Sequence, residues 1–187
     1  MTVDLLNQSL AVTPGWQVAS VAPVRLEPEQ LTLALLDIDA NLQFDSSEIG
    51  SLWEHMPYWA FAWAGGRATA CYLLQHPELV AGKRVLDLGC GSGIAAVQAA
   101  RCGAAEVWVY DIDPLAMQAA SINAALNGVT LHSLEQPEFS GFDLFMAGDL
   151  LYDPAGRTTL RQLIDDIPQG LLAEPLSASR YQTAQPH

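Results

Sequence analysis

The chain has 187 residues, half of them hydrophobic, which is enough for one domain with a substantial core. Its 21 acidic and 8 basic residues give a formal net charge of −13, and Lys and Arg are not clustered anywhere. A nucleic-acid-binding protein needs a basic surface that neutralises phosphates, so this balance argues against a DNA or RNA substrate.

The N-terminal part of the chain carries few strong signals. Residues 1–17 are mixed in polarity and contain Pro14-Gly15, which predicts a loose N-terminal segment. The apolar run at 31–36 fits either a strand or a short helix, because its periodicity does not decide between them. Residues 51–56 are typical of a helical turn, and Pro57 would end it.

An unusual aromatic segment follows at 57–66, with the sequence Pro-Tyr-Trp-Ala-Phe-Ala-Trp-Ala-Gly-Gly. These rings could form a plug that covers the core. They could also form the wall of a pocket, where flat rings stack on an adenine or line a channel for an alkyl-ammonium group. The sequence leaves both interpretations open. An apolar helix is expected over 68–75, ended by Pro77.

The most informative stretch is a βαβ unit at 84–113. A short apolar strand runs directly into Gly89-Cys90-Gly91-Ser92-Gly93. An Ala-rich helix is expected over 94–102, and a second strand over 106–110 ends on Asp111. Glycines allow a sharp turn and the close approach of a ligand, and the helix N-terminus offers free N–H groups to that ligand.

The spacing of the glycines distinguishes between two cofactor classes. A dinucleotide-binding loop has the pattern G-x-G-x-x-G, whereas this chain has G-x-G-x-G with Asp87 two residues earlier. A carboxylate at this strand end suits a ligand ammonium group and would repel a pyrophosphate. Asp111, 20 positions after Gly91, is suited to bind the hydroxyl groups of a ribose. The pattern resembles the first motif of methyltransferases that use S-adenosylmethionine.

The remaining elements continue the alternation of strands and helices. Asp113-Pro114 is typical of a helix start, and Asn127-Gly128 of its end. Further strands are expected at 129–132, 141–147 and 170–175, with a helix at 158–167. This alternation predicts an α/β fold with a doubly wound parallel sheet, whose ligand binds at the carboxyl ends of the strands.

Several motifs occur together in an order typical of one family. They are the aromatic-Gly-Gly segment, the glycine loop, Asp111-Ile-Asp-Pro114, Asn123 and Gly148-Asp149-Leu-Leu-Tyr152. Together they resemble class I (seven-β-strand) S-adenosylmethionine-dependent methyltransferases, and most closely the electron-transfer flavoprotein β-subunit lysine methyltransferases. The resemblance implies a Rossmann-like sheet with strand order 3-2-1-4-5. It also implies methyl transfer from S-adenosyl-L-methionine to a lysine side chain of a protein substrate.

The resemblance also implies a role for individual residues. Asp149 and Tyr152 match the acceptor site and are the candidate catalytic residues. The candidate cofactor-binding residues are Trp63, Asp87, Gly89, Gly91, Ser92, Gly93 and Asp111. From the residues alone, Asp149 could instead be the N-cap of the following helix. The four histidines lack the spacing of metal ligands, so no metal is expected.

We expect residues 18–176 to form the methyltransferase domain, with a cap over 18–66, a Rossmann-like core over 67–176 and a polar tail over 177–187. Members of the family usually add two antiparallel strands after the fifth strand. Residues 177–187 are too few for a hairpin, so strands 6 and 7 are expected to be missing. Two copies of the chain would then associate as a homodimer through the open edge of strand 5, or residues 31–36 would cover that edge.

Two other functions stay open on these grounds. The chain could methylate a small molecule, or it could be a shortened, non-catalytic module that binds a cofactor or a protein. Its apolar runs are shorter than a membrane span, and its start lacks the basic stretch of a signal peptide. Three scattered cysteines are typical of reduced thiols, so we expect a cytoplasmic protein.

Overall fold

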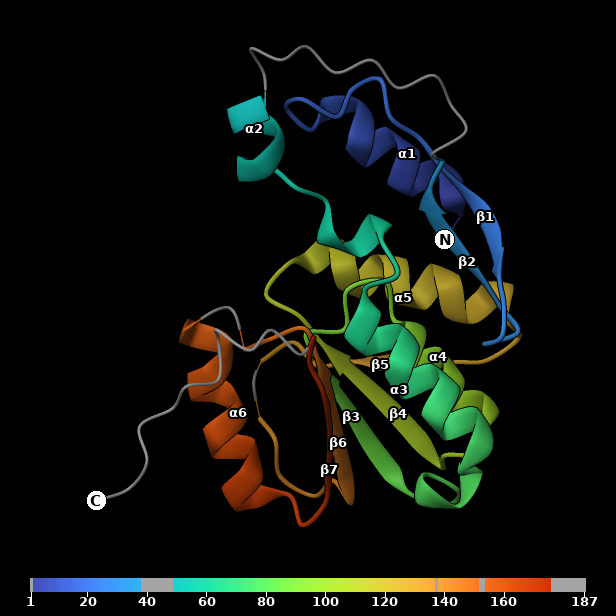
Figure 1. Ribbon diagram of the computed structural model, residues 1–187, viewed down its shortest axis with the longest axis vertical. Coiled ribbons are helices and arrows are strands. Elements are labelled where there is room, and N and C mark those ends of the chain that lie inside the picture. Colours follow the sequence, from blue (N-terminus) through green and yellow to red (C-terminus); the bar gives the residue numbers. More distant parts are fainter. Residues whose placement is uncertain (1, 38–48, 137, 152–153, 176–187) are drawn as a thin grey trace.

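The computed structural model describes residues 2–37, 49–136, 138–151 and 154–175 (Figure 1). Its centre is a five-stranded parallel sheet with the order β5-β4-β3-β6-β7. The strands are β3 (Arg84–Leu88), β4 (Glu106–Tyr110), β5 (His132–Ser133), β6 (Leu144–Gly148) and β7 (Gly170–Ala173). In chain order this is 3-2-1-4-5, so the predicted fold class and strand order are confirmed.

Helices cover both faces of the sheet (Figure 1). Val85 of β3 packs in a core with α3 (Ala64–Gln75), α4 (Ile94–Arg101) and α5 (Pro114–Leu126). Its neighbour Leu86 points to the opposite face, because side chains alternate along a strand, and packs against α6 (Pro154–Asp166). The parallel strands are therefore buried on both faces, and their carboxyl ends meet at one edge.

The N-terminal part forms a cap over α5. Strands β1 (Val21–Leu26) and β2 (Leu31–Leu36) pair antiparallel, which settles the open choice at 31–36 in favour of a strand. Asn123 of α5 accepts a hydrogen bond from the Ala34 N–H at 2.7 Å. Two short 3-10 helices, η2 (Tyr58–Ala60) and η3 (Pro77–Leu79), connect the cap to α3 and α3 to β3.

The structure corrects the expectation of a loose segment at 1–17. Residues Val3–Val12 form helix α1, which packs against β1. Leu6 and Leu10 are fully buried, and their spacing places them on one helix face. The side chain of Asn7 exchanges hydrogen bonds of 2.7 and 3.2 Å with the backbone of Val21. The helix forms because the hairpin supplies the apolar surface that it covers. The division into cap and core stays a prediction.

Strand β7 lies at one end of the sheet. Among the described residues it pairs only with β6, and the Leu172 side chain is 48% exposed. The suggestion that residues 31–36 cover this edge is wrong, because they pair with β1. Residues 176–187, where further strands would follow, lie outside the described residues. Homodimerisation through this edge stays a prediction.

We expect Leu10→Ala to lower the free energy of unfolding by about 2–5 kcal/mol, because it leaves a cavity between α1 and the cap. Val12→Ala, at a position on the same helix that is 79% exposed, should change this free energy by less than about 0.5 kcal/mol. Urea denaturation followed by circular dichroism measures both. Equal effects of the two substitutions would mean that α1 is not packed as described.

Candidate active site

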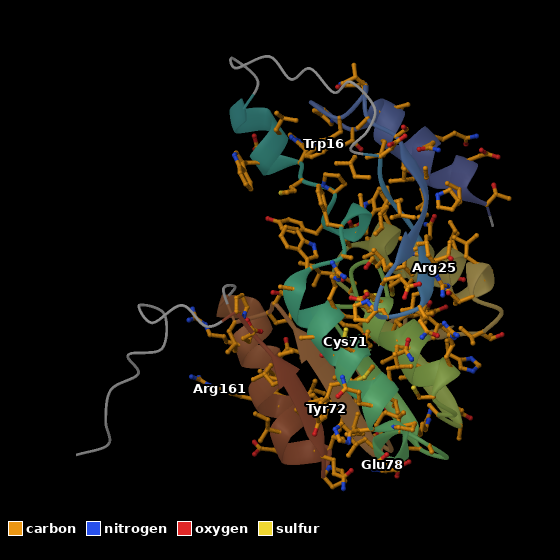
Figure 2. The ribbon with its side chains drawn as sticks, turned by 45° about the vertical axis from the view of Figure 1, so that its right-hand side comes forward. Trp16, Arg25, Cys71, Tyr72, Glu78 and Arg161 are labelled. Carbon is orange, nitrogen blue, oxygen red and sulfur yellow. The ribbon has the colours of Figure 1, made fainter. Side chains whose placement is uncertain are left out.

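The carboxyl ends of β3, β4 and β6 open into a cavity of about 590 Å³. This volume lies within the range of small-molecule sites, roughly 300–1,000 Å³. Part of the mouth comes from α2 (Ile49–Glu54), whose Trp53 lines the cavity. Trp16, labelled in Figure 2, donates its indole N–H to the Leu52 carbonyl at 3.2 Å and so holds α2 in place.

The three glycines of the loop between β3 and α4 serve different purposes. All three have positive φ angles. A Cβ at Gly89 would lie 2.5 Å from the Leu150 side chain, and one at Gly93 would lie 2.5 Å from Ala120. A Cβ at Gly91 would meet no atom within 4 Å, although Gly91 lines the cavity. Gly89 and Gly93 therefore permit close packing, whereas Gly91 leaves space that a ligand can fill.

Asp111, at the end of β4, is bonded to this loop. Its Oδ2 accepts a hydrogen bond from the Gly91 N–H at 3.0 Å, and its Oδ1 accepts one from the Asp113 N–H at 3.0 Å. Burial raises the pKa of the Asp111 carboxyl, although these N–H donors oppose the shift. The side chain remains partly exposed to the cavity, so its oxygens are within reach of a ligand.

Asp87 is more deeply buried, with 4% of its surface exposed. Its Oδ2 accepts a hydrogen bond from the Ala96 N–H of α4 at 3.1 Å. Burial raises the pKa of Asp87 to about 7; the Ala96 N–H opposes this shift and the negative charge of Asp111 adds to it. A buried carboxylate of this kind is stabilised by any cation that enters the cavity.

Asp149 lies directly after β6, at the carboxyl end of that strand. Its Oδ2 accepts a hydrogen bond from the Gly65 N–H at 2.7 Å, and its own N–H donates to the Ala173 carbonyl at 3.1 Å. The carboxylate therefore caps α3, rather than the helix that follows it in the sequence. It also lines the cavity. Tyr152, the second candidate catalytic residue, lies outside the described residues.

The aromatic segment contains both a plug and a wall. Trp59 is 1% exposed and belongs to the core. Tyr58 and Trp63 are exposed and line the cavity, with their ring centroids 5.7 Å apart. The Trp63 indole N–H donates to the Tyr58 carbonyl at 2.8 Å, which fixes the ring at the mouth. Trp59 therefore fits the interpretation as a plug over the core, and Tyr58 and Trp63 fit the interpretation as a pocket wall.

Comparison with known proteins shows which proteins this chain is similar to. Residues 67–152 match the family model described as ribosomal protein L11 methyltransferase (PrmA). The electron transfer flavoprotein beta subunit lysine methyltransferase of Danio rerio is 44% identical over 111 residues, which cover 57% of this chain and 43% of that protein. The ribosomal protein L11 methyltransferase of Bordetella parapertussis is 32% identical over 132 residues, 69% of this chain and 37% of that protein. The central part of the chain is therefore similar to methyltransferases.

A solved structure shows the same fold. A candidate RNA methyltransferase from Pyrococcus horikoshii has a TM-score of 0.50 and 19% identity, over 60% of this chain and 59% of that one. The chain spans less than half the length of the two curated relatives named above. No helix among its described residues is long and apolar enough to cross a membrane. The cytoplasmic location stays a prediction.

The cavity brings together most of the residues that the sequence analysis singled out. Its lining includes Trp63, Asp87, Gly89, Gly91, Ser92, Asp111 and Asp149. Gly93 packs behind the loop, against Ala120. Their roles in binding and catalysis stay predictions. In the described part of the chain, no three His, Cys, Asp or Glu side chains could hold a metal ion, and no Lys, Arg or His lines the cavity.

Other residues, which were not predicted from the sequence, also line the cavity. They are Trp53 and Met56 near the mouth, Tyr110 and Ile112 beside Asp111, and Glu174 after β7. Glu174 had a usable signal, because the carboxyl ends of parallel strands converge on the ligand site. Trp53 had none, because it reaches the cavity only through the packing of α2 against the N-terminal segment.

The raised pKa of Asp87 predicts how stability depends on pH. Because the folded pKa of about 7 exceeds the ordinary value of 3.8, the native state binds this proton more tightly than the unfolded state does. The stabilisation is complete below pH 4 or so and is lost as the pH rises to about 7. Over that window, Asp87→Asn should become more stable than the wild type by roughly 4 kcal/mol, measured by urea denaturation.

The asparagine oxygen can still accept the Ala96 N–H, so the substitution removes the charge and keeps the contact. Asp165→Asn, which removes an exposed carboxylate of α6, is the matched control. Its stability should follow that of the wild type at every pH. A difference between Asp87→Asn and the wild type that does not change between pH 4 and pH 7 would contradict the shift.

Proposed function

We propose that this chain transfers methyl groups from S-adenosyl-L-methionine to the side-chain amine of a lysine on a protein substrate. The observation that carries the proposal is the cavity. Its lining includes the carboxylates of Asp87, Asp111 and Asp149, the open space over Gly91 and the aromatic rings of Tyr58 and Trp63. The similarity to protein lysine methyltransferases supports the same reading.

The cofactor end fits S-adenosylmethionine by its chemistry. The ligand carries a positively charged sulfonium, an ammonium group and a ribose. Asp87 would offset the positive charge of its methionine part. Asp111 would accept hydrogen bonds from the ribose hydroxyl groups beside the backbone N–H groups that it already accepts. Gly91 would leave room for the ligand, since nothing lies within 4 Å of its missing Cβ. Trp63 would cover one side.

The acceptor end fits a cationic side chain. When bound, S-adenosylmethionine supplies a methyl group that an uncharged amine can attack in line. A lysine amine has a pKa near 10.4 in water, so it enters as an ammonium ion. Asp149 would receive and orient this ion, and Tyr58 and Trp63 would pack along its alkyl chain. The main contribution of these residues is alignment of the reacting atoms.

Asp149 orients the lysine and is not its general base. A carboxylate beside the amine stabilises the ammonium form, which is unreactive, so the proton must leave to water or through Tyr152. The favourable effect comes later, as positive charge builds on the nitrogen during alkylation. The net charge of −13 would also attract a lysine-bearing protein at low ionic strength.

A transfer assay tests the function and separates it from its alternatives. The wild-type chain is incubated with cell lysate and cofactor labelled in the methyl group, and the products are separated on a gel. We expect a labelled protein band, whose label amino-acid analysis places on methyl-lysine. Label confined to small molecules would favour a small-molecule methyltransferase, and no transfer at all would favour a non-catalytic binding module.

Gly91→Val should abolish the binding of S-adenosylmethionine, because the branched side chain fills the space that the ligand needs. Gly103→Val is the matched control, since Gly103 also has a positive φ and open surroundings but lies at the far end of α4. Calorimetry should lose the heat of binding in the first variant and keep it in the second. Equal affinity in both variants would remove Gly91 from the cofactor site.

Asp149→Asn should lower the rate of transfer by roughly 100-fold and leave cofactor affinity within a few-fold. The asparagine oxygen can still accept the Gly65 N–H, so the cap on α3 persists while the charge is lost. Asp143→Asn, at the opposite end of the sheet, serves as control, because its carboxylate also accepts a backbone N–H. A joint collapse of cofactor affinity and thermal stability would make Asp149 a structural cap only.

A further inference from the structure

The turn after β6 is held by the end of β7 through consecutive backbone amides. The Asp149 N–H donates to the Ala173 carbonyl at 3.1 Å. The next two N–H groups, of Leu150 and Leu151, both donate to Oε1 of Glu174, at 2.7 and 3.1 Å. One carboxylate oxygen therefore accepts two neighbouring amides, and such charge-assisted hydrogen bonds are stronger than neutral ones.

This turn needs an external support, because Asp149 has a φ angle of 54°. A residue with a side chain is uncommon in this left-handed conformation, although Asp adopts it more readily than most, and hydrogen bonds to the turn help to hold it there. Two supports are present. Gly65 holds the Asp149 carboxylate, and Glu174 holds the backbone that follows it. The two contacts together fix where the Asp149 carboxylate lies in the cavity.

Glu174 is thus bonded directly to the turn that carries Asp149, and it has no direct hydrogen bond to the glycine loop. Its side chain lines the cavity, as does that of Asp149. Its hydrogen bonds are to Leu150 and Leu151, not to Asp87, Gly91 or Asp111. A change at Glu174 should therefore act first on Asp149, and it reaches the glycine loop only through the Leu150 side chain, which lies beside Gly89.

We propose that Glu174 is a positioning residue for methyl transfer, which holds the turn at 149–151 so that Asp149 faces the acceptor amine. The proposal rests on the proposed function. Glu174 acts through Asp149 and has no step of its own in the reaction. Misplacement of a reacting group by about 1 Å can slow a reaction roughly 100-fold, so a contact of this kind has a measurable effect.

The test compares Glu174→Ala, Glu174→Gln and the wild type. The alanine variant loses the acceptor of both amides, and its kcat should fall by roughly 100-fold. The glutamine variant keeps an oxygen at the same place, and its kcat should stay within about tenfold of the wild type. The cofactor Kd, measured by calorimetry, should change by less than about threefold in both. Glu138→Ala, at an exposed carboxylate before β6, should match the wild type.

Three results would overturn the proposal. One is a kcat of Glu174→Ala within about threefold of the wild type, which is too small a change for a misplaced reacting group. Another is an equal loss in the glutamine and alanine variants, since a neutral acceptor would then fail to restore the turn. The third is a loss of cofactor affinity and melting temperature in step with kcat, which is the pattern of a purely structural residue.

Amide hydrogen exchange separates this proposal from the proposed function, because it needs no substrate. The amides of Leu150 and Leu151 should be protected in the wild type and in Glu174→Gln, and exchange faster in Glu174→Ala. A wild type that methylates nothing overturns the proposed function, and exchange alone then decides whether Glu174 holds the turn. Unprotected amides in the wild type, or protected ones in Glu174→Ala, overturn the positioning role.

Discussion

The arrangement of the site depends on the close contact between the N-terminus of α3 and the carboxyl ends of β6 and β7. A Cβ at Gly65 would lie 2.4 Å from the Ala173 carbonyl and 2.7 Å from the Asp149 carboxylate. A Cβ at Gly148 would lie 3.1 Å from the backbone of Gly65. Only glycines allow this approach. It brings the aromatic segment before α3, the turn after β6 and the end of β7 to one wall of the cavity.

The electrostatics of the cavity follow from the charged side chains that the described residues place in its lining. Carboxylates line both ends, at Asp87 and Asp111 and at Asp149 and Glu174, and no basic side chain joins them. Folding therefore buries negative charge without a neutralising partner, and the raised pKa of Asp87 reflects that cost. A ligand with positive charge offsets this cost, and a phosphate would increase it. The same property that destabilises the empty chain thus selects for cationic ligands.

The parts of the fold that the sequence predicted are those whose signals are local. The glycine loop, the strands on either side of α4 and the start of α5 are encoded by a few neighbouring residues. Asp113, for example, accepts the Leu115 N–H at 2.9 Å, as an N-cap before proline should. Helix α1 could not be predicted in this way, because its stability comes from burying Leu6 and Leu10 against residues that follow in the chain. The third strand was expected at 129–132 and forms only at His132–Ser133.

The candidate site shows the same division between local and distant determinants. Asp87, Gly91 and Asp111 belong to one continuous motif, and spacing was enough to bring them together. Glu174 is 24 and 23 positions from the two residues whose N–H groups it accepts. No motif in the sequence between them predicts the contact. The sequence left open whether Asp149 is an acceptor-site residue or the cap of the following helix. Its carboxylate accepts the Gly65 N–H of α3, which lies far from it in the sequence and beside it in space.

One further link connects the glycine loop to the cap. Asn123 of α5 is fully buried; it donates to the Ser92 carbonyl at 2.8 Å and accepts from the Ala34 N–H of β2 at 2.7 Å. A buried amide that satisfies groups on two sides is costly to disturb, because either change leaves a polar group unpaired. The loop is therefore supported by the cap as well as by the sheet. The N-terminal residues, which carry no recognisable motif, thus contribute to the shape of the loop that the cofactor would contact.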